Sequence, residues 1–149
     1  MRKLLAGFLV LAMIFALVGC GGNSSKEGSQ PGTAYIDDCY IEITDCKAQI
    51  STYSRQFIAV VWVDFENNSD SATSLFFTAS IKAYQNGKEL SAAAWVPAHH
   101  GVENDWSDNI QPGYSISTGY AFVLNDTSAP ITVQICDGAD VVSEKLFNV

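Results

Sequence analysis

The run of residues 57–65 limits the possible folds more than any other part of the chain. Successive side chains of a strand point to opposite faces, and this run is apolar on both: Val61 and Phe65 share one face, while Ile58, Val60 and Trp62 share the other. An apolar run of this length is typical of a strand that is buried on both sides. We therefore predict that residues 57–65 form the central strand of a sheet.

Other segments of the chain alternate between apolar and polar residues, as half-buried strands do. Residues 75–84 are expected to form one continuous strand, with Leu75, Phe77 and Ile81 on the buried face. The remaining predicted strands are residues 41–44, 114–124, 131–135 and 141–147.

Turn-forming residues separate these segments. Asn86-Gly87 favours a type I′ hairpin turn, in which both central residues need positive φ. Gln111-Pro112-Gly113 has Pro and Gly in the order of a type II turn. Residues 67–71 and 125–130 are further loops of turn formers. About seven short strands with such turns predict an all-β fold, an immunoglobulin-like antiparallel β-sandwich.

The N-terminus has the layout of a secretory signal. Arg2 and Lys3 are positively charged, and residues 4–18 are almost entirely apolar. The apolar stretch is shorter than the roughly 20 residues that cross a membrane comfortably. A cleaved signal is therefore favoured over a permanent membrane helix, which is the alternative.

The end of this signal matches the lipobox, at which bacterial lipoprotein precursors are cut and acylated. The match is Leu17-Val18-Gly19-Cys20. The resemblance implies that residues 1–19 are removed and that Cys20 begins the mature chain and carries its acyl chains. More than one chain anchors a protein stably. We predict a cell-membrane lipoprotein, anchored on the extracytoplasmic face, rather than a freely secreted protein.

Residues 20–34 follow as a linker, and residues 35–149 form the folded domain. After Cys20 the linker holds Gly, Ser, Pro, Asn and Gln and no large apolar side chain, so it cannot bury enough surface to fold. Without Arg2 and Lys3 the chain has 6 basic and 16 acidic residues, a formal net charge of −10. Such a charge excludes nucleic acid as a partner, because nucleic acid requires a basic surface.

Several of these features together resemble a family of unknown function. They are the strand ending in Phe65-Glu66-Asn67-Asn68-Ser69-Asp70, the hairpin from Tyr84 to Leu90, Ile110-Gln111-Pro112-Gly113, and the stretch from Leu124 to Val133. The domain is similar to one that recurs in lipoproteins of Gram-positive bacteria and is related to antigen-like, immunoprotective extracellular β-sandwiches. The resemblance implies fold and location, and it assigns no catalytic residue. The three cysteines of the domain depart from the family pattern.

Those cysteines are Cys39, Cys46 and Cys136. By strand alternation Cys39 shares the inward face of Ile41, whereas Cys46 and Cys136 share the polar faces of their strands. If a disulfide forms, we predict that it joins Cys46 to Cys136, provided that their strands are neighbours. Three reduced thiols are the alternative. A zinc site is disfavoured because no fourth ligand lies at metal spacing, and no cofactor is predicted.

The segment from Ser91 to Ile110 is longer than ordinary loops. We predict it as the binding loop, with Trp95, His99, His100 and Trp106 as its candidate residues. Both tryptophans could instead cap an open end of the sandwich. A metal could use one imidazole with Glu103 or Asp105, although adjacent histidines in a strand point in opposite directions.

Two classes of function remain open. The favoured class is a non-catalytic binding module whose ligand is a protein or a glycan, because a rigid sandwich displays its loops. The alternative is a hydrolase or metal-dependent enzyme that uses His99 and His100. No GxSxG elbow or other positioned nucleophile is present to support the alternative.

Overall fold

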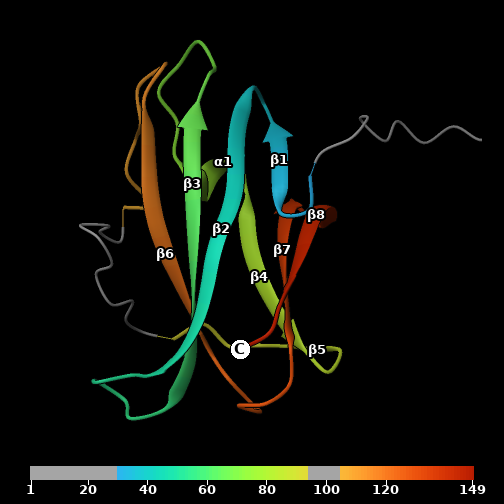
Figure 1. Cartoon of the computed structure of the whole chain (residues 1–149). Helices are drawn as coiled ribbons and strands as arrows, with labels where there is room; N and C mark the ends of the chain where they lie inside the picture. Colours follow the sequence, from blue (N-terminus) through green and yellow to red (C-terminus); the bar gives the residue numbers. More distant parts are fainter. Residues whose placement is uncertain (1–29, 94–104) are drawn as a thin grey trace, which may run out of the picture.

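The computed structural model describes residues 30–93 and 105–149, which form two antiparallel sheets of four strands (Figure 1). The first sheet has the order β1-β2-β3-β6, with β1 Thr33–Ile36, β2 Cys39–Ile50, β3 Phe57–Asn67 and β6 Ser115–Val123. The second has the order β5-β4-β7-β8, with β4 Ser80–Gln85, β5 Lys88–Glu89, β7 Ile131–Asp137 and β8 Asp140–Phe147. The predicted all-β antiparallel sandwich is confirmed. No helix in these two described ranges is long and apolar enough to span a membrane.

The central position of β3 is confirmed. It pairs with β2 on one side and with β6 on the other. Its inward side chains, among them Val61, Val63 and Phe65, belong to the main core between the sheets. Its outward side chains Ile58, Val60 and Trp62 form a second buried cluster with Ala121 of β6.

The main core is built by the alternating positions that the sequence indicated. Residues that are at most 1% exposed come from both sheets, and burying each large one contributes about 1.5–3 kcal/mol. They include Ile41, Ile43, Val61, Val63, Phe65, Ala83, Ile131, Val133 and Ile135.

The predicted turns are present. Asn86 and Gly87 have φ of +52° and +76° and join β4 to β5. Gly113 has φ of +80°, and the N–H of Tyr114 donates to the carbonyl of Gln111 at 3.1 Å, which closes the type II turn. A further hairpin, which was not predicted, is made by an Asp-Asp pair: residues 37 and 38 have φ of +47° and +62° between β1 and β2.

The prediction of one strand over residues 75–84 is wrong in its first half. A short helix, α1 (Leu75–Thr78), precedes β4. The Ser74 hydroxyl accepts a hydrogen bond from the N–H of Phe77 at 3.4 Å, so Ser74 is an N-cap that ends the extended backbone. As a result Leu75 is buried but Phe77 is 77% exposed instead of facing the core.

The predicted boundary between linker and domain is also two residues late. Thr33 and Ala34, placed in the linker, belong to β1, and Ala34 is only 1% exposed. The edge is held by main-chain pairing that composition does not reveal: the N–H of Ile43 donates to the carbonyl of Gly32 at 2.8 Å.

The two long sides of the sandwich differ. On the β1 and β8 side, the ammonium of Lys145 on β8 donates to the carbonyl of Ile43 on β2 at 2.8 Å, and the N–H of Gly32 donates to the hydroxyl of Ser143 at 3.0 Å. These contacts close that side. On the other side β6 ends the first sheet, and the two-residue β5 pairs only with Tyr84 and Gln85 of β4. The start of β4 therefore has no β5 neighbour, and among residues 30–93 and 105–149 a groove remains between β4 and β6.

Candidate functional site

An aromatic groove lies along this open side. It has a volume of about 350 Å³ and is lined by residues of α1, β4 and β6, by Ala92 and Ala93, and by Trp106. No lining residue is charged, and the largest apolar ones are Phe76, Ile81, Trp106, Tyr120 and Phe122. This volume is within the usual range for small-molecule sites.

Main-chain hydrogen bonds fix both described ends of the segment from Ser91 to Ile110. At the first end the N–H of Ala93 donates to the carbonyl of Ala121 at 2.7 Å, so that the chain runs beside β6. At the second end the N–H of Ile110 donates to the carbonyl of Thr73 at 2.7 Å. These two contacts place the groove between the ends of the predicted binding loop.

Three aromatic rings lie next to one another in the groove, with that of Trp106 between the other two. The ring of Trp106 has its centroid 5.3 Å from that of Phe76 and 6.2 Å from that of Tyr120. The N–H of Phe76 also donates to the carbonyl of Trp106 at 2.9 Å, which holds α1 against this segment. Burial raises the pKa of the Tyr120 phenol, so its hydroxyl stays neutral. An uncharged aromatic surface of this kind suits an apolar group.

Part of this aromatic surface is exposed. Phe76 is 56% exposed and the adjacent Phe77 is 77% exposed, with ring centroids 5.3 Å apart. Single exposed apolar side chains are ordinary, whereas contiguous ones that continue into a groove mark interaction sites. Phe76 and Tyr120 were absent from the predicted site, and the signal that could have indicated Phe76 was Ser74 as a helix N-cap.

The side chain of Asn67 positions the segment that carries Trp106. Asn67 is fully buried, and its amide nitrogen donates to the carbonyls of Ser71 and Ile110, each at 2.8 Å. Its amide oxygen accepts from the N–H and hydroxyl of Ser69 at 3.0 and 2.6 Å. One amide therefore joins the end of β3 to the second end of the loop.

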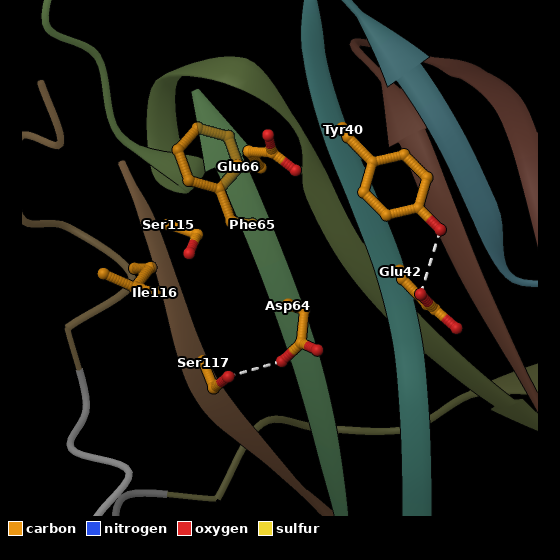
Figure 2. Close-up of a pocket in the computed structure, with 8 residues that line it drawn as sticks. All are labelled: Tyr40, Glu42, Asp64, Phe65, Glu66, Ser115, Ile116 and Ser117. Atoms are coloured by element: carbon orange, nitrogen blue, oxygen red, sulfur yellow. Dashed lines mark hydrogen bonds between the residues drawn. The ribbon is translucent and has the colours of Figure 1, made fainter. Parts of the chain in front are cut away.

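A second, smaller hollow of about 180 Å³ lies on the outer face of the first sheet (Figure 2). The hydroxyl of Tyr40 donates to Glu42 at 2.9 Å, and that of Ser117 donates to Asp64 at 2.5 Å. Desolvation and then the hydrogen bond to Glu42 raise the pKa of Tyr40 to about 12. Within residues 30–93 and 105–149 no three His, Cys, Asp or Glu side chains are grouped so that they could hold a metal ion. This acidic hollow does not have the geometry of a metal centre.

The comparisons with known proteins are consistent with the resemblance drawn from the sequence. The family model described as "Domain of unknown function (DUF5067)" matches residues 22–137. The chain belongs to this family. The predicted membership of a family of unknown function is thereby confirmed.

A solved structure has a fold similar to that of this chain. It is the "Structure of a putative lipoprotein from Staphylococcus aureus subsp. aureus NCTC 8325", with a TM-score of 0.58 and 11% sequence identity. The alignment covers 80% of this chain and 89% of that one. A comparison with curated proteins finds no match.

Among the predicted loop residues, Trp106 is the one that the structure describes. It is partly buried and packs against the main core while lining the aromatic groove. This packing is that of a cap, and a role as a binding anchor stays a prediction. Trp95, His99 and His100 lie outside the described residues, as does the predicted lipidation site, Cys20.

The reasoning that paired Cys46 with Cys136 does not hold, and the structure has free thiols at Cys39, Cys46 and Cys136. A register shift between Ile43 and Asp45 of β2 turns Cys46 into the main core. Cys136 belongs to the other sheet and follows the core residue Ile135 on β7. The strands are not neighbours and the faces do not match. Burial raises the pKa of Cys46 to about 12.

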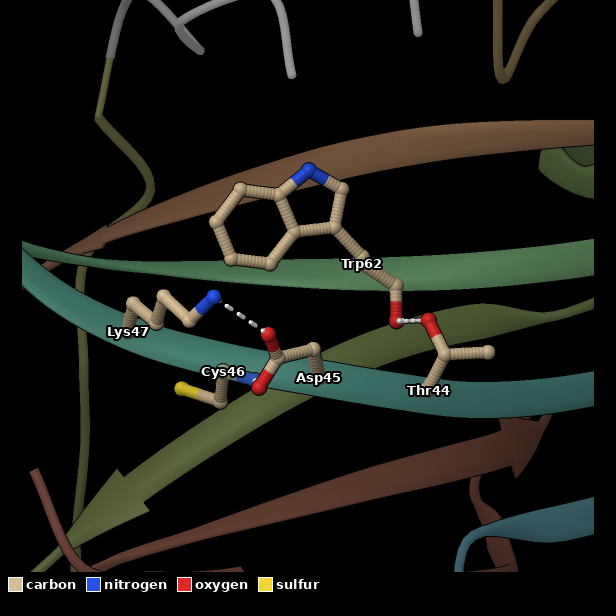
Figure 3. A network of polar contacts seen from close by, with 5 residues as sticks. All are labelled: Thr44, Asp45, Cys46, Lys47 and Trp62. Atoms are coloured by element: carbon tan, nitrogen blue, oxygen red, sulfur yellow. Dashed lines mark hydrogen bonds and ion pairs between the residues drawn. The ribbon is translucent and has the colours of Figure 1, made fainter. Parts of the chain in front are cut away.

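Polar contacts on the outer side of this bulge accompany the change of register (Figure 3). The Thr44 hydroxyl donates to the carbonyl of Trp62 at 3.2 Å. Asp45 accepts from the N–H of Cys46 at 2.8 Å and pairs with the ammonium of Lys47 at 2.9 Å. Lys47 also lies 5.7 Å above the ring of Trp62. These polar contacts lie on the outer face of the first sheet, whereas the thiol of Cys46 points into the main core.

Proposed function

We propose that the chain is a lipid-anchored extracytoplasmic protein whose folded domain is a non-catalytic binding module. The observation that carries the binding proposal is the aromatic groove, an uncharged hollow bordered by exposed Phe76 and Phe77 on a rigid sandwich. Catalysis needs positioned acid, base or nucleophilic groups, whereas this lining is almost entirely apolar.

The anchoring part of the proposal is supported by the signal-like N-terminus and Cys20. Support also comes from the fold shared with a Gram-positive protein described as a putative lipoprotein. In this arrangement the acyl chains on Cys20 hold the chain to the cell membrane, and the segment that follows separates the domain from the lipid. The domain then faces the cell exterior, where a partner can reach its groove.

The anchor is tested by changing Cys20 to Ser in the full chain. The variant should lose its acyl chains and move from the detergent-rich to the aqueous phase in detergent phase separation. Unchanged partition of the variant would show that Cys20 is not the anchor.

The binding function is tested with envelope fragments of the native cells. The Cys20→Ser chain, which lacks the lipid that would itself insert into the membrane, should bind them, and adding Phe76→Ala in that background should reduce the binding at least tenfold, because removal of a hot-spot aromatic costs about 2 kcal/mol. The matched control is Tyr53→Ala, which removes an aromatic side chain that is 79% exposed in the connection from β2 to β3. Equal losses from both variants would argue against the groove.

A paired test addresses the enzymatic alternative. The double variant His99→Ala with His100→Ala should bind envelope fragments as the wild type does. If the double variant loses envelope binding while Phe76→Ala retains it, the histidine loop rather than the aromatic groove would be the functional site.

A further inference from the structure

The end of the sandwich that carries α1, called here the α1 end, is acidic. Its connections are residues 37–38, 68–79, 105–114 and 137–139, which join the strands at that end. With Asp140 at the start of β8, they contain seven aspartates and no Lys or Arg. Asp105 and Asp108 flank Trp106 in one turn, where the N–H of Asp108 donates to the carbonyl of Asp105 at 2.9 Å. The negative charge of Asp105 and Asp108 therefore borders the aromatic groove.

The groove itself contains no charge. Its polar side-chain groups are the hydroxyls of Ser80 and Tyr120 and the indole N–H of Trp106, and the other lining side chains are apolar or absent. A glycan would require several converging hydrogen-bond partners in such a site. An apolar side chain requires none, and it would gain about 25 cal/mol for each Å² of apolar surface that it buries.

We propose that the aromatic groove binds an apolar side chain of a basic peptide segment belonging to another protein. The apolar side chain enters beside Phe76 and Trp106, and Lys or Arg on either side of it lie close to Asp105 and Asp108. This division of roles follows charge complementarity: the acidic border attracts and orients the segment, while the apolar contact holds it. The inference rests on the proposed binding function and specifies its ligand.

The test uses the full-length acylated chain in nanodiscs of zwitterionic lipid and a fluorescent peptide, Lys-Lys-Ser-Phe-Ser-Lys-Lys. Two control peptides replace its phenylalanine by serine or its four lysines by glutamates. Fluorescence anisotropy should show saturable binding of the first peptide and at least tenfold weaker binding of both controls. Empty nanodiscs give the background. Absence of binding, or equal binding of the serine peptide or of the glutamate peptide, would overturn the proposal.

Variants then locate the interaction. Phe76→Ala should weaken peptide binding at least tenfold, while Tyr53→Ala should leave it unchanged. Because Phe76→Ala could alter α1, a second variant, Asp105→Asn with Asp108→Asn, removes charge and keeps the shape of both side chains. It should weaken binding severalfold and reduce its dependence on salt. The charge control is Glu144→Gln on β8, and this variant should bind the peptide as tightly as the wild type does. Equal effects of Tyr53→Ala or Glu144→Gln would contradict the proposed location.

The result is separable from the test of the proposed function. If envelope fragments bind in a Phe76-dependent manner but no basic peptide does, the binding module stands and the ligand assigned here is wrong. If neither binds, both proposals fail.

Discussion

At each end of the sandwich a buried side-chain amide holds a loop, but the two loops carry different side chains. At the α1 end the buried amide of Asn67 holds the second end of the loop that carries Trp106. At the opposite end, called here the hairpin end, the amide of Gln85 is 2% exposed and holds the connection from β6 to β7. Its nitrogen donates to the carbonyls of Asp126 and Ala129 at 2.7 and 2.9 Å, and its oxygen accepts from the N–H groups of Asn125 and Asp126.

What differs is the surface that each amide supports. The segment held by Gln85 is a compact polar loop, in which Asp126 also accepts from the N–H of Ser128 at 2.8 Å. The segment held by Asn67 carries aromatic side chains. The main-chain N–H of Phe76 donates to the carbonyl of Trp106, which keeps these two residues side by side at the surface. A buried, fully bonded amide fixes an irregular loop equally well in both cases. The side chains on that loop then decide whether the surface at that end is polar or aromatic.

The largest expected effect comes from removing either amide. Asn67→Ala and Gln85→Ala should each lower the free energy of unfolding by about 3 kcal/mol or more, because buried main-chain groups lose their partners. Denaturant unfolding measures both. The variants should differ in groove function: the folded fraction of Gln85→Ala should bind envelope fragments normally, whereas Asn67→Ala should bind weakly. Equal binding by both would show that Asn67 does not position the groove.

A smaller difference is expected within the aromatic surface of the α1 end. Trp106→Ala should cost about 2 kcal/mol of stability, since this side chain packs partly against the core. Phe77→Ala should change stability by less than about 0.5 kcal/mol, because Phe77 is largely exposed. Thermal and denaturant unfolding of the two variants make the comparison. A large loss of stability from Phe77→Ala would mean that α1 contributes more to the core than its exposure indicates.

Alkaline pH tests whether the two ends share one core. The pKa of Cys46 is about 12 in the folded protein, compared with an ordinary value of 9.0. The unfolded chain therefore loses this proton first, so the stability is full below pH 9 and declines as the pH rises toward 12. The expected loss is about 1.4 kcal/mol per pH unit in that window, and Cys46→Ala should remove this part of it.

The readout for that titration is hydrogen exchange at one amide of each end. The N–H of Gly113 donates to the carbonyl of Asn67, and the N–H of Asn125 donates to the side chain of Gln85. If both ends cover one cooperative core, the two amides should lose protection together as the pH rises. Loss at only one end would show that the ends open independently.

The smallest effect is expected at two turn glycines, one at each end. Gly87 and Gly113 have φ of +76° and +80°, and an added Cβ would meet no atom within 4 Å at either position. Gly87→Ala and Gly113→Ala should each cost about 1 kcal/mol, from the left-handed backbone alone. Denaturant unfolding should give similar values. A clearly larger loss at Gly113 would indicate that the α1 end also depends on the exact position of its turn.

Much of the fold could be predicted because it depends on neighbouring residues. The alternation in residues 57–65 identifies β3, and Asn86-Gly87 and Pro112-Gly113 mark their turns. The site was predicted less well. Trp106 was included, but Phe76 and Tyr120 were not, because no sequence pattern relates a short helix and an edge strand that meet across the open side of a sandwich.

The sequence by itself determined most of the strand pattern and the turns, because both depend on the period of the side chains and on which residues tolerate positive φ. Its motifs also indicated the family by resemblance. Only the tertiary structure decided which way Cys46 points, since the bulge beside Ile43 adds a residue and reverses the alternation. It also decided that α1 interrupts the expected strand and that Phe76, Trp106 and Tyr120 meet in one groove. Those outcomes depend on contacts between segments that are distant in the chain, which no local pattern encodes.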